Sequence, residues 1–421
     1  MRFPAQRLRL HSAHPGAASA VIGVIALHVV DDAFLQTEPG TSAGDHLAGG
    51  LVPFALLAAG ALALPRLRAG ARAAVAALFG VFGVVTGIEA AYYTLNGGPS
   101  GDDYTGLLSA VAGLVLLGIG AATLWKTRRV NDSLRRRYLR RSLTTAASLV
   151  FALTILFPAA LGYVFTHTAR AQVPTPNLGA AHEHVAFETD DGLTLKGWFV
   201  PSQNGATVIV FPGRSGPQQQ TRMLVRNGYG VLLFDRRGEG ASEGDPNIFG
   251  WGGERDLHAA VDYLSSRDDV DPARIGGIGL SVGGEMLIRA AAQSAAFKAI
   301  VAEGASGQSV RDDFANDQLG DVIASSVITL STAVFSDEIP PHSLKSDVAR
   351  IAPRAVFLIY GEDGQGGTEK GPNLGFYASA GHPKQLWEVP EGQHVAGITT
   401  RPKEYERRVI AFLDRELLRN A

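Results

Sequence analysis

The hydrophobic pattern divides the chain into two parts of different character. Up to about residue 170, apolar residues form long runs, each near the ~20 residues that cross a bilayer as a helix. The runs cover roughly residues 17–35, 47–64, 73–95, 104–125 and 143–165. His28, Asp31 and Asp32 interrupt the first run, which also fits a cleaved signal peptide, but four more runs follow it. The pattern predicts an all-α bundle of about five transmembrane helices over residues 1–170.

Basic residues alternate between the segments that connect these runs. Lys and Arg are absent between the first and second runs and between the third and fourth. They gather in the other three segments, as Arg2, Arg7 and Arg9, then Arg66, Arg68 and Arg72, then Lys126, Arg128, Arg129, Arg135, Arg136, Arg137, Arg140 and Arg141. The positive-inside rule places these segments in the cytoplasm. With five spans, everything after about residue 166 is expected outside the cytoplasm, in a multi-pass protein of the cell membrane.

After a Pro-containing linker at residues 171–180, short apolar strands alternate with amphipathic helices. Strands are predicted at His184–Glu188, Thr194–Val200, Thr207–Phe211, Gly230–Phe234, Arg274–Leu280, Ala299–Glu303, Ala355–Tyr360 and Lys384–Val389. Helices are predicted at Gln218–Asn227, Glu254–Arg267, Val282–Ala292 and Lys403–Leu418. This alternation predicts an α/β domain over residues 181–421 with a mostly parallel eight-stranded sheet, helices on both faces, and an antiparallel edge made by the first two strands.

Ser281 is the main candidate for chemistry. It is the central residue of Gly279-Leu280-Ser281-Val282-Gly283, which follows the fifth predicted strand and opens an Ala-rich helix. Strand, G-x-S-x-G and helix in this order are typical of a nucleophile elbow, in which the glycines permit a sharp turn that exposes the Ser hydroxyl. A Ser hydroxyl is a poor nucleophile at neutral pH, so a nearby base is required.

Three further motifs appear at the expected places along the same domain. Phe211-Pro212-Gly213-Arg214 follows the third strand, Asp235-Arg236-Arg237-Gly238-Glu239-Gly240-Ala241-Ser242 the fourth, and Val389-Pro390-Glu391-Gly392-Gln393-His394 the eighth. Together with the elbow they resemble the α/β-hydrolase superfamily, in particular the prolyl-oligopeptidase-like and dienelactone-hydrolase-like serine esterases and peptidases. The resemblance implies that His394 is the base and that the backbone N–H groups of Val282 and Arg214 form the oxyanion hole.

The third member of the triad is harder to assign. The resemblance places an acid in the loop after the strand Ala355–Tyr360, usually as Gly-x-x-Asp. Here Gly361-Glu362-Asp363-Gly364 brings the Asp one position early. Asp363 is favoured, Glu369 is the alternative acid, and Glu362 is also in reach. A Glu can orient the imidazole as well as an Asp can.

Residues 304–350 form an insertion between the sixth and seventh strands. In this fold such an insertion is expected to be a small cap over the pocket. Its apolar positions between Val310 and Phe335 have helical spacing, which fits either core packing or an acyl-binding wall.

Several other functions are disfavoured. The chain has no Cys, which excludes disulfides and thiol nucleophiles, and its net charge of −2 gives no sign of nucleic-acid binding. Gly277-x-Gly279-x-x-x-Gly283 also fits a dinucleotide-binding pattern, but no Tyr-x-x-x-Lys accompanies it. His182 and His184 share a face of a strand, yet no third metal ligand is evident. No cofactor and no metal are predicted.

These patterns together predict a membrane-anchored serine hydrolase with Ser281 as nucleophile and a small-molecule or lipid-like ester as substrate. Two alternatives remain open: an acyltransferase acting on envelope alcohols, and a catalytically idle membrane sensor or scaffold. Membrane lipids are the expected surroundings of the first 170 residues. Their Gly and Ala content also permits homo-oligomers through the membrane helices.

Overall fold

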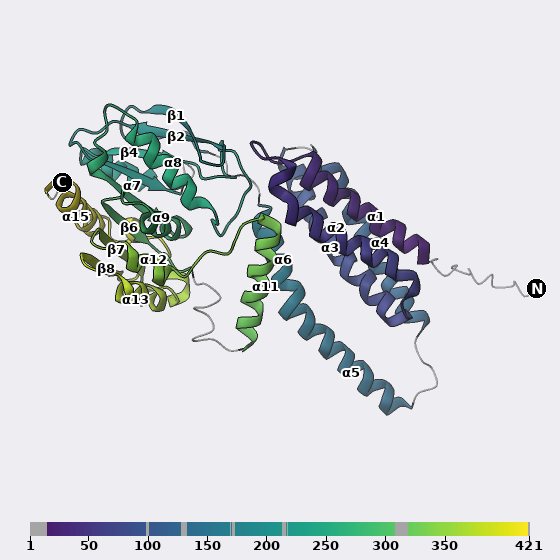
Figure 1. The fold of residues 1–421 in the computed structure, drawn as a ribbon. Helices are drawn as coiled ribbons and strands as arrows, with labels where there is room; N and C mark the ends of the chain where they lie inside the picture. The colour runs from purple at the N-terminus through teal and green to yellow at the C-terminus, as the bar shows by residue number, and fades with distance from the viewer. Residues whose placement is uncertain are drawn as a thin grey trace, which may run out of the picture. The chain divides into compact units, whose positions relative to one another are not determined.

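A computed structural model describes residues 15–97, 101–127, 133–168, 170, 173–212, 216, 218–307 and 319–419 (Figure 1). The chain forms two compact units. One is helical and comprises residues up to 37, residues 42–164 and residues 330–337. The other contains the sheet and comprises residues 38–41, 165–329 and 338 onward.

The helical unit contains the long apolar helices that the hydrophobic pattern predicted. They are α1 (Pro15–Val30), α2 (Leu47–Ala63), α3 (Ala69–Gly97), α4 (Asp103–Lys126), and α5 (Leu134–Phe151), which continues through a π-helical turn into α6 (Phe157–Thr166). Within the described residues, five segments are long and apolar enough to cross a membrane: Gly16–Leu35, Ala43–Arg66, Ala69–Leu95, Asp103–Lys126 and Tyr138–Thr166. The prediction of five apolar helices is confirmed.

Small residues let α3 and α4 approach closely. A Cβ atom on Gly113 would lie 2.6 Å from the carbonyl oxygen of Gly80, and one on Gly80 would lie 2.9 Å from the carbonyl oxygen of Gly113. Helices in lipid gain their association from such close packing, because burying apolar side chains against one another offers little over contact with acyl chains. The buried centre of the unit includes Ile22, Ile25 and Leu116.

The second unit is built on one eight-stranded sheet. Its strands are β1 (Glu183–Glu188), β2 (Thr194–Val200), β3 (Thr207–Phe211), β4 (Gly230–Phe234), β5 (Ile275–Leu280), β6 (Ala299–Glu303), β7 (Ala355–Gly361) and β8 (Lys384–Val389). Their order in the sheet is β1-β2-β4-β3-β5-β6-β7-β8. The pairs β1–β2 and β2–β4 are antiparallel and all others are parallel. Both the mostly parallel sheet and its antiparallel edge were predicted.

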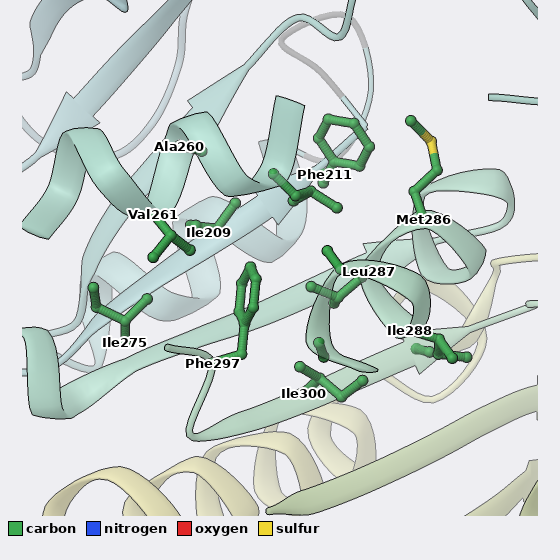
Figure 2. Packing of buried hydrophobic residues seen from close by; sticks show 14 of the residues in the cluster. Ile209, Phe211, Ala260, Val261, Ile275, Met286, Leu287, Ile288, Phe297 and Ile300 are labelled. Carbon is green, nitrogen blue, oxygen red and sulfur yellow. The ribbon is translucent and has the colours of Figure 1, made fainter. Parts of the chain in front are cut away.

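Alternating side chains of each strand feed two cores, one on each face of the sheet. In β3, Ile209 and Phe211 join one cluster while Val208 and Val210 join the other, as the two-residue period of a strand requires. Figure 2 shows part of the first cluster, where Phe211, Leu287 and Phe297 lie together between sheet and helices. The residues of both clusters are buried, and a close-packed interior of this kind limits movement of the strands that it holds.

The helices of this unit divide between the two faces. Residues of α8 (Gly253–Ser265), α9 (Val282–Gln293), α12 (Leu344–Arg350) and α13 (Lys370–Ser379) belong to the first cluster. Residues of α7 (Gln218–Arg226) and α15 (Pro402–Leu413) belong to the second. The sheet therefore has helices on both faces, as predicted.

Two segments pack away from their neighbours in sequence. Residues 38–41, between the first two apolar helices, belong to the sheet unit, where Gly244 N–H donates to the carbonyl oxygen of Pro39 at 2.9 Å. Conversely, α11 (Leu319–Ser336) lies in the predicted cap, yet Leu330–Asp337 belongs to the helical unit. Within the helical unit this segment contacts α6, through Ser331 to Ala159 and Phe335 to Tyr163, and the cap expected over residues 304–350 stays a prediction.

Candidate active site

Ser281 lies on a strained turn between β5 and α9. Its φ is 52° and its ψ is −126°, a conformation that a residue with a Cβ atom rarely adopts and that is typical of a nucleophile elbow. Its backbone N–H donates to the carbonyl oxygen of Glu303 at 2.8 Å, which ties the turn to the end of β6. A Cβ atom on Gly283 would lie 2.8 Å from the carbonyl oxygen of Phe211, so a glycine is needed there for the turn to pack on β3.

His394 reaches Ser281 from the loop after β8. Its Nε2 lies 2.8 Å from Ser281 Oγ, although 113 residues separate the two in the chain. The predicted pair of Ser281 and His394 is therefore brought together within hydrogen-bonding distance. Half-buried, the imidazole remains accessible on one side, with 30% of its side-chain surface exposed.

The carboxylate against His394 is Glu369, not Asp363. Nδ1 of His394 and Oε1 of Glu369 are in direct contact, and the Glu369 side chain is 0% exposed. With the proton of a neutral imidazole on Nδ1, facing the carboxylate, Nε2 can accept the Ser281 hydroxyl proton. The geometry corrects the preference for Asp363 that the Gly-x-x-Asp spacing suggested.

The structure also shows why Glu369, five residues after Gly364, is the carboxylate that contacts His394. Gly364 stands where the usual spacing would place an Asp, and a Cβ atom on it would overlap the carboxyl group of Glu369. Glu369 therefore reaches back into the space that an Asp side chain would otherwise occupy. The N–H of Gly361, at the end of β7, donates to Glu369 Oε2 at 3.1 Å and fixes the second oxygen.

The other two carboxylates of the loop point elsewhere. Both Asp363 and Glu362 are exposed. Glu362 Oε2 accepts the backbone N–H of Glu391 at 3.0 Å, and the backbone N–H of Asp363 donates to the carbonyl oxygen of Gly392 at 2.9 Å. These contacts join the loop after β7 to the loop that carries His394, which is a structural role.

Of the two predicted oxyanion-hole residues, Val282 is described by the structure. Val282 is the first residue of α9, so its N–H belongs to the positive N-terminal end of the helix beside Ser281. Arg214 lies outside the described residues. The arrangement at Val282 suits a negative charge that forms on an oxygen next to Ser281.

Sequence reasoning missed a second buried carboxylate, Glu303. It ends β6, is 1% exposed, and accepts hydrogen bonds at 2.8 Å from both Gly397 N–H and the Tyr405 hydroxyl. Burial raises the pKa of Glu303. Since Gly397 follows His394 by three residues, this carboxylate holds the histidine loop on the sheet. The sequence did contain a signal for this buried carboxylate, because Glu303 ends a strand that is otherwise apolar.

Glu285 and Gln365 are two further polar residues near the pair. Glu285, in the first turn of α9, accepts the backbone N–H of Gly307 at 2.6 Å and so ties down the chain that leaves β6. Burial raises the pKa of Glu285. Gln365 Nε2 lies 3.5 Å from His394 Nδ1. Neither residue stands out in the sequence, because carboxylates in the first turn of a helix and amides in loops are both common and usually solvated.

The Asp235–Ser242 motif is structural. Asp235 Oδ2 accepts the N–H of Ala241 at 3.2 Å, and the Ser242 hydroxyl donates to the carbonyl oxygen of Asp235 at 2.6 Å. Arg237 forms a buried ion pair with Asp256 at 2.7 Å. These contacts close the loop after β4, which explains why charged residues are buried there.

Among the described residues, no three His, Asp or Glu side chains converge as a metal site requires. His182 and His184 lie side by side with ring centroids 5.7 Å apart, and His184 Nδ1 accepts the Trp198 Nε1–H at 3.3 Å. This pair therefore packs on an indole at the sheet edge.

Comparisons with known proteins found a family model and several relatives. A family model described as X-Pro dipeptidyl-peptidase (S15 family) matches residues 166–351. YfhR of Salmonella typhi, described as uncharacterized, is 28% identical over 304 residues, which cover 66% of this chain and 93% of YfhR. Polyketide transferase GrgF of a Penicillium species is 37% identical over 116 residues, which cover 26% of this chain and 40% of GrgF.

Solved structures also align with part of this chain. The Pyrococcus furiosus esterase Pf2001 aligns with a TM-score of 0.48 and 24% identity, over 59% of this chain and 98% of the esterase. The crystal structure of GrgF aligns with a TM-score of 0.46 and 21% identity, over 56% of this chain and 99% of GrgF.

Proposed function

We propose that this chain, a member of the α/β-hydrolase superfamily, is a membrane-anchored serine hydrolase that cleaves carboxylic esters through an acyl-enzyme on Ser281. The observation that carries the proposal is the hydrogen-bonded series from Ser281 Oγ to His394 Nε2 and from His394 Nδ1 to Glu369. Packing alone does not require a half-buried histidine to contact both a buried carboxylate and a serine on a strained turn.

Each residue has a defined role in the reaction. Ser281 Oγ attacks the substrate carbonyl carbon while His394 Nε2 takes its proton. Negative charge forms on the carbonyl oxygen, and the N–H groups of Val282 and Arg214 are the proposed donors to it. His394 then passes the proton to the departing alcohol, which leaves an acyl group on Ser281. Water attacks that ester with His394 again as base, and the acid is released. Glu369 holds the imidazole in the required tautomer throughout.

Two other functions were left open by the sequence. Transfer of the acyl group to an alcohol instead of water needs the same three residues, and the relative GrgF is named a polyketide transferase. An idle sensor or scaffold would not need Glu369 buried against His394, so the placement of Glu369 supports an enzyme over a scaffold.

Covalent labelling tests the proposal directly. Purified full-length protein should react with a fluorophosphonate probe at Ser281, because the probe mimics the carbonyl and traps an activated serine. The Ser281→Ala variant should not be labelled, and peptide mass spectrometry of the wild type should find the adduct on Ser281. Equal labelling of both proteins, or no labelling of a folded wild type, would refute the assignment.

We further propose that the catalytic unit lies outside the cytoplasm. The asymmetric distribution of Lys and Arg supports this orientation. Alkaline phosphatase fused after Ala421 should be active, because it matures only outside the cytoplasm, whereas the same enzyme fused after Thr127 should be inactive. A cytoplasm-only reporter should show the reverse pattern. Activity of that reporter after Ala421 would mean that the number of membrane crossings is even.

A further inference from the structure

His394 lies in a tight turn whose backbone is strained. The N–H of Ala396 donates to the carbonyl oxygen of Gln393 at 3.2 Å, so His394 and Val395 are the two central residues of this turn. Val395 has a φ of 48°. A positive φ at the second central position is typical of a type II turn, where Gly or Asn usually stands, and it is an outlier for a β-branched residue. Contacts with the surroundings must therefore hold the turn in this conformation.

The turn rests on the end of β6. A Cβ atom on Gly304, which follows that strand, would lie 2.9 Å from Val395 Cγ1 and 3.1 Å from His394 Cε1. The missing side chain makes room for both central residues, but this contact supplies no bond that resists rotation of the turn. Glu303 supplies one, because its Oε1 accepts the N–H of Gly397, the residue that follows the turn, at 2.8 Å.

The Glu303 carboxylate is itself fixed in place. Its Oε2 accepts a hydrogen bond from the hydroxyl of Tyr405, a buried residue of α15, at 2.8 Å. A Cβ atom on Gly397 would lie 2.8 Å from Glu303 Oε1, so a glycine is needed for the loop to come this close. Burial of a carboxylate costs free energy, and an apolar side chain would satisfy the packing of this strand equally well. The two hydrogen bonds, not packing, therefore account for a Glu at this position.

The same residue also bonds to the turn that carries the nucleophile. The carbonyl oxygen of Glu303 accepts the N–H of Ser281, whose φ is 52°, at 2.8 Å. In the sheet, β6 lies between β5, which ends just before Ser281, and β7, which precedes the loop of Glu369. Glu303 thus contacts both strained turns, one through its backbone and the other through its side chain.

We infer that Glu303 is a positioning residue for His394. Its bond to Gly397 holds the turn with Val395 at positive φ and thereby keeps the imidazole beside Ser281. The inference rests on the proposed function and adds a fourth residue to the three that carry it. Without the bond, rotation of Val395 to negative φ relieves the strain and moves the imidazole with the turn. Gly adopts positive and negative φ about equally readily, so a Val395→Gly turn would keep much of its active conformation without the bond.

A double-variant cycle tests the inference on activity. Glu303→Met removes both acceptor oxygens and fills a similar volume. It should lower kcat for p-nitrophenyl acetate by about 100-fold with KM little changed, because misplacement of a reacting group by ~1 Å costs about this much. In the Val395→Gly background the same substitution should lower kcat by about tenfold or less. Glu188→Met, at the exposed end of β1, is the matched control and should stay within about twofold.

Two kinetic outcomes would overturn the inference. Equal loss of kcat in both backgrounds would show that the strain at Val395 plays no part. A Glu303→Met protein that is folded by circular dichroism and has wild-type kcat would show that Glu303 positions nothing. Glu303→Asp keeps the charge but shortens the reach to Gly397, so it should lower kcat by about tenfold, and again by less in the Val395→Gly background. This variant decides the question by the same comparison if Glu303→Met does not fold.

Hydrogen–deuterium exchange gives a readout that does not depend on catalysis. The peptide that contains Gly397 should exchange about tenfold faster in Glu303→Met than in the wild type, because loss of the bond exposes its N–H to water. Unchanged exchange would overturn the inference even if the wild type is active. Faster exchange, together with a wild type that does not react with the fluorophosphonate, would refute the proposed chemistry but leave the support of the turn by Glu303 intact. The two failures are therefore distinguishable.

Discussion

Ser281→Ala should lower kcat/KM for short p-nitrophenyl esters by about 10³-fold or more, because no other hydroxyl can take the place of the attacking atom. The expectation rests on the 2.8 Å approach of His394 Nε2 to Ser281 Oγ and on the strained turn that presents the hydroxyl. The effect should fall on kcat, since binding contacts to the ester are unchanged. Steady-state kinetics on purified protein would measure it.

The matched control is another serine of the same unit. Ser266, at the exposed end of α8, bonds only locally to the carbonyl oxygen of Tyr263 at 2.8 Å. Ser266→Ala should therefore change kcat/KM by no more than about twofold. Circular dichroism and thermal unfolding should show that both variants fold. A folded Ser281→Ala protein with wild-type activity would show that the esterase reaction occurs elsewhere in the molecule.

Glu369→Gln should lower kcat by on the order of 10⁴-fold with KM little changed, as removal of the acid does in well-studied triads. A Gln amide in this place can donate to His394 Nδ1. That contact favours the tautomer with the proton on Nε2, which cannot accept the Ser281 proton. The amide also cannot stabilise the imidazolium that forms as Ser281 attacks. Measurement of kcat and KM separately distinguishes this loss from weaker substrate binding.

Asp363→Asn and Glu362→Gln are the controls for this result, because each makes the same carboxylate-to-amide change in the same loop. Both side chains are exposed, and each variant should cost less than about tenfold. The opposite ranking, with Asp363→Asn crippled and Glu369→Gln active, would show that the loop rearranges when substrate binds. Unchanged activity in all three variants would favour a Ser–His dyad, whereas a folded wild type without activity would favour an idle domain.

Much of this protein could be predicted because the relevant signals are local in the sequence. Each apolar helix is a run of about 20 residues, and each strand is a short apolar run bounded by turn residues. All eight strands were predicted within a residue or so of their observed bounds. Ser281 and His394 were identified because the nucleophile elbow and the final loop have characteristic neighbours along the chain.

The acid illustrates what local patterns do not contain. Three carboxylates lie within eight residues after β7, and all are compatible with the loop's composition. Which one reaches His394 depends on the turn at Gly364, where the missing side chain makes room for Glu369, and on the Gly361 N–H that holds its second oxygen. Glu303 was overlooked for the same reason, since its partners Gly397 and Tyr405 lie 94 and 102 residues away.

The sequence by itself determined the two-part organisation, the elements of each part, and Ser281 and His394 as the candidate pair, because hydrophobic period and motif spacing are properties of consecutive residues. Only the tertiary structure decided which carboxylate contacts His394. It alone showed that residues 38–41 belong to the sheet unit and Leu330–Asp337 to the helical unit. Those outcomes depend on contacts between distant segments, where steric fit and hydrogen-bond partners, not local propensity, select among residues of equal chemistry.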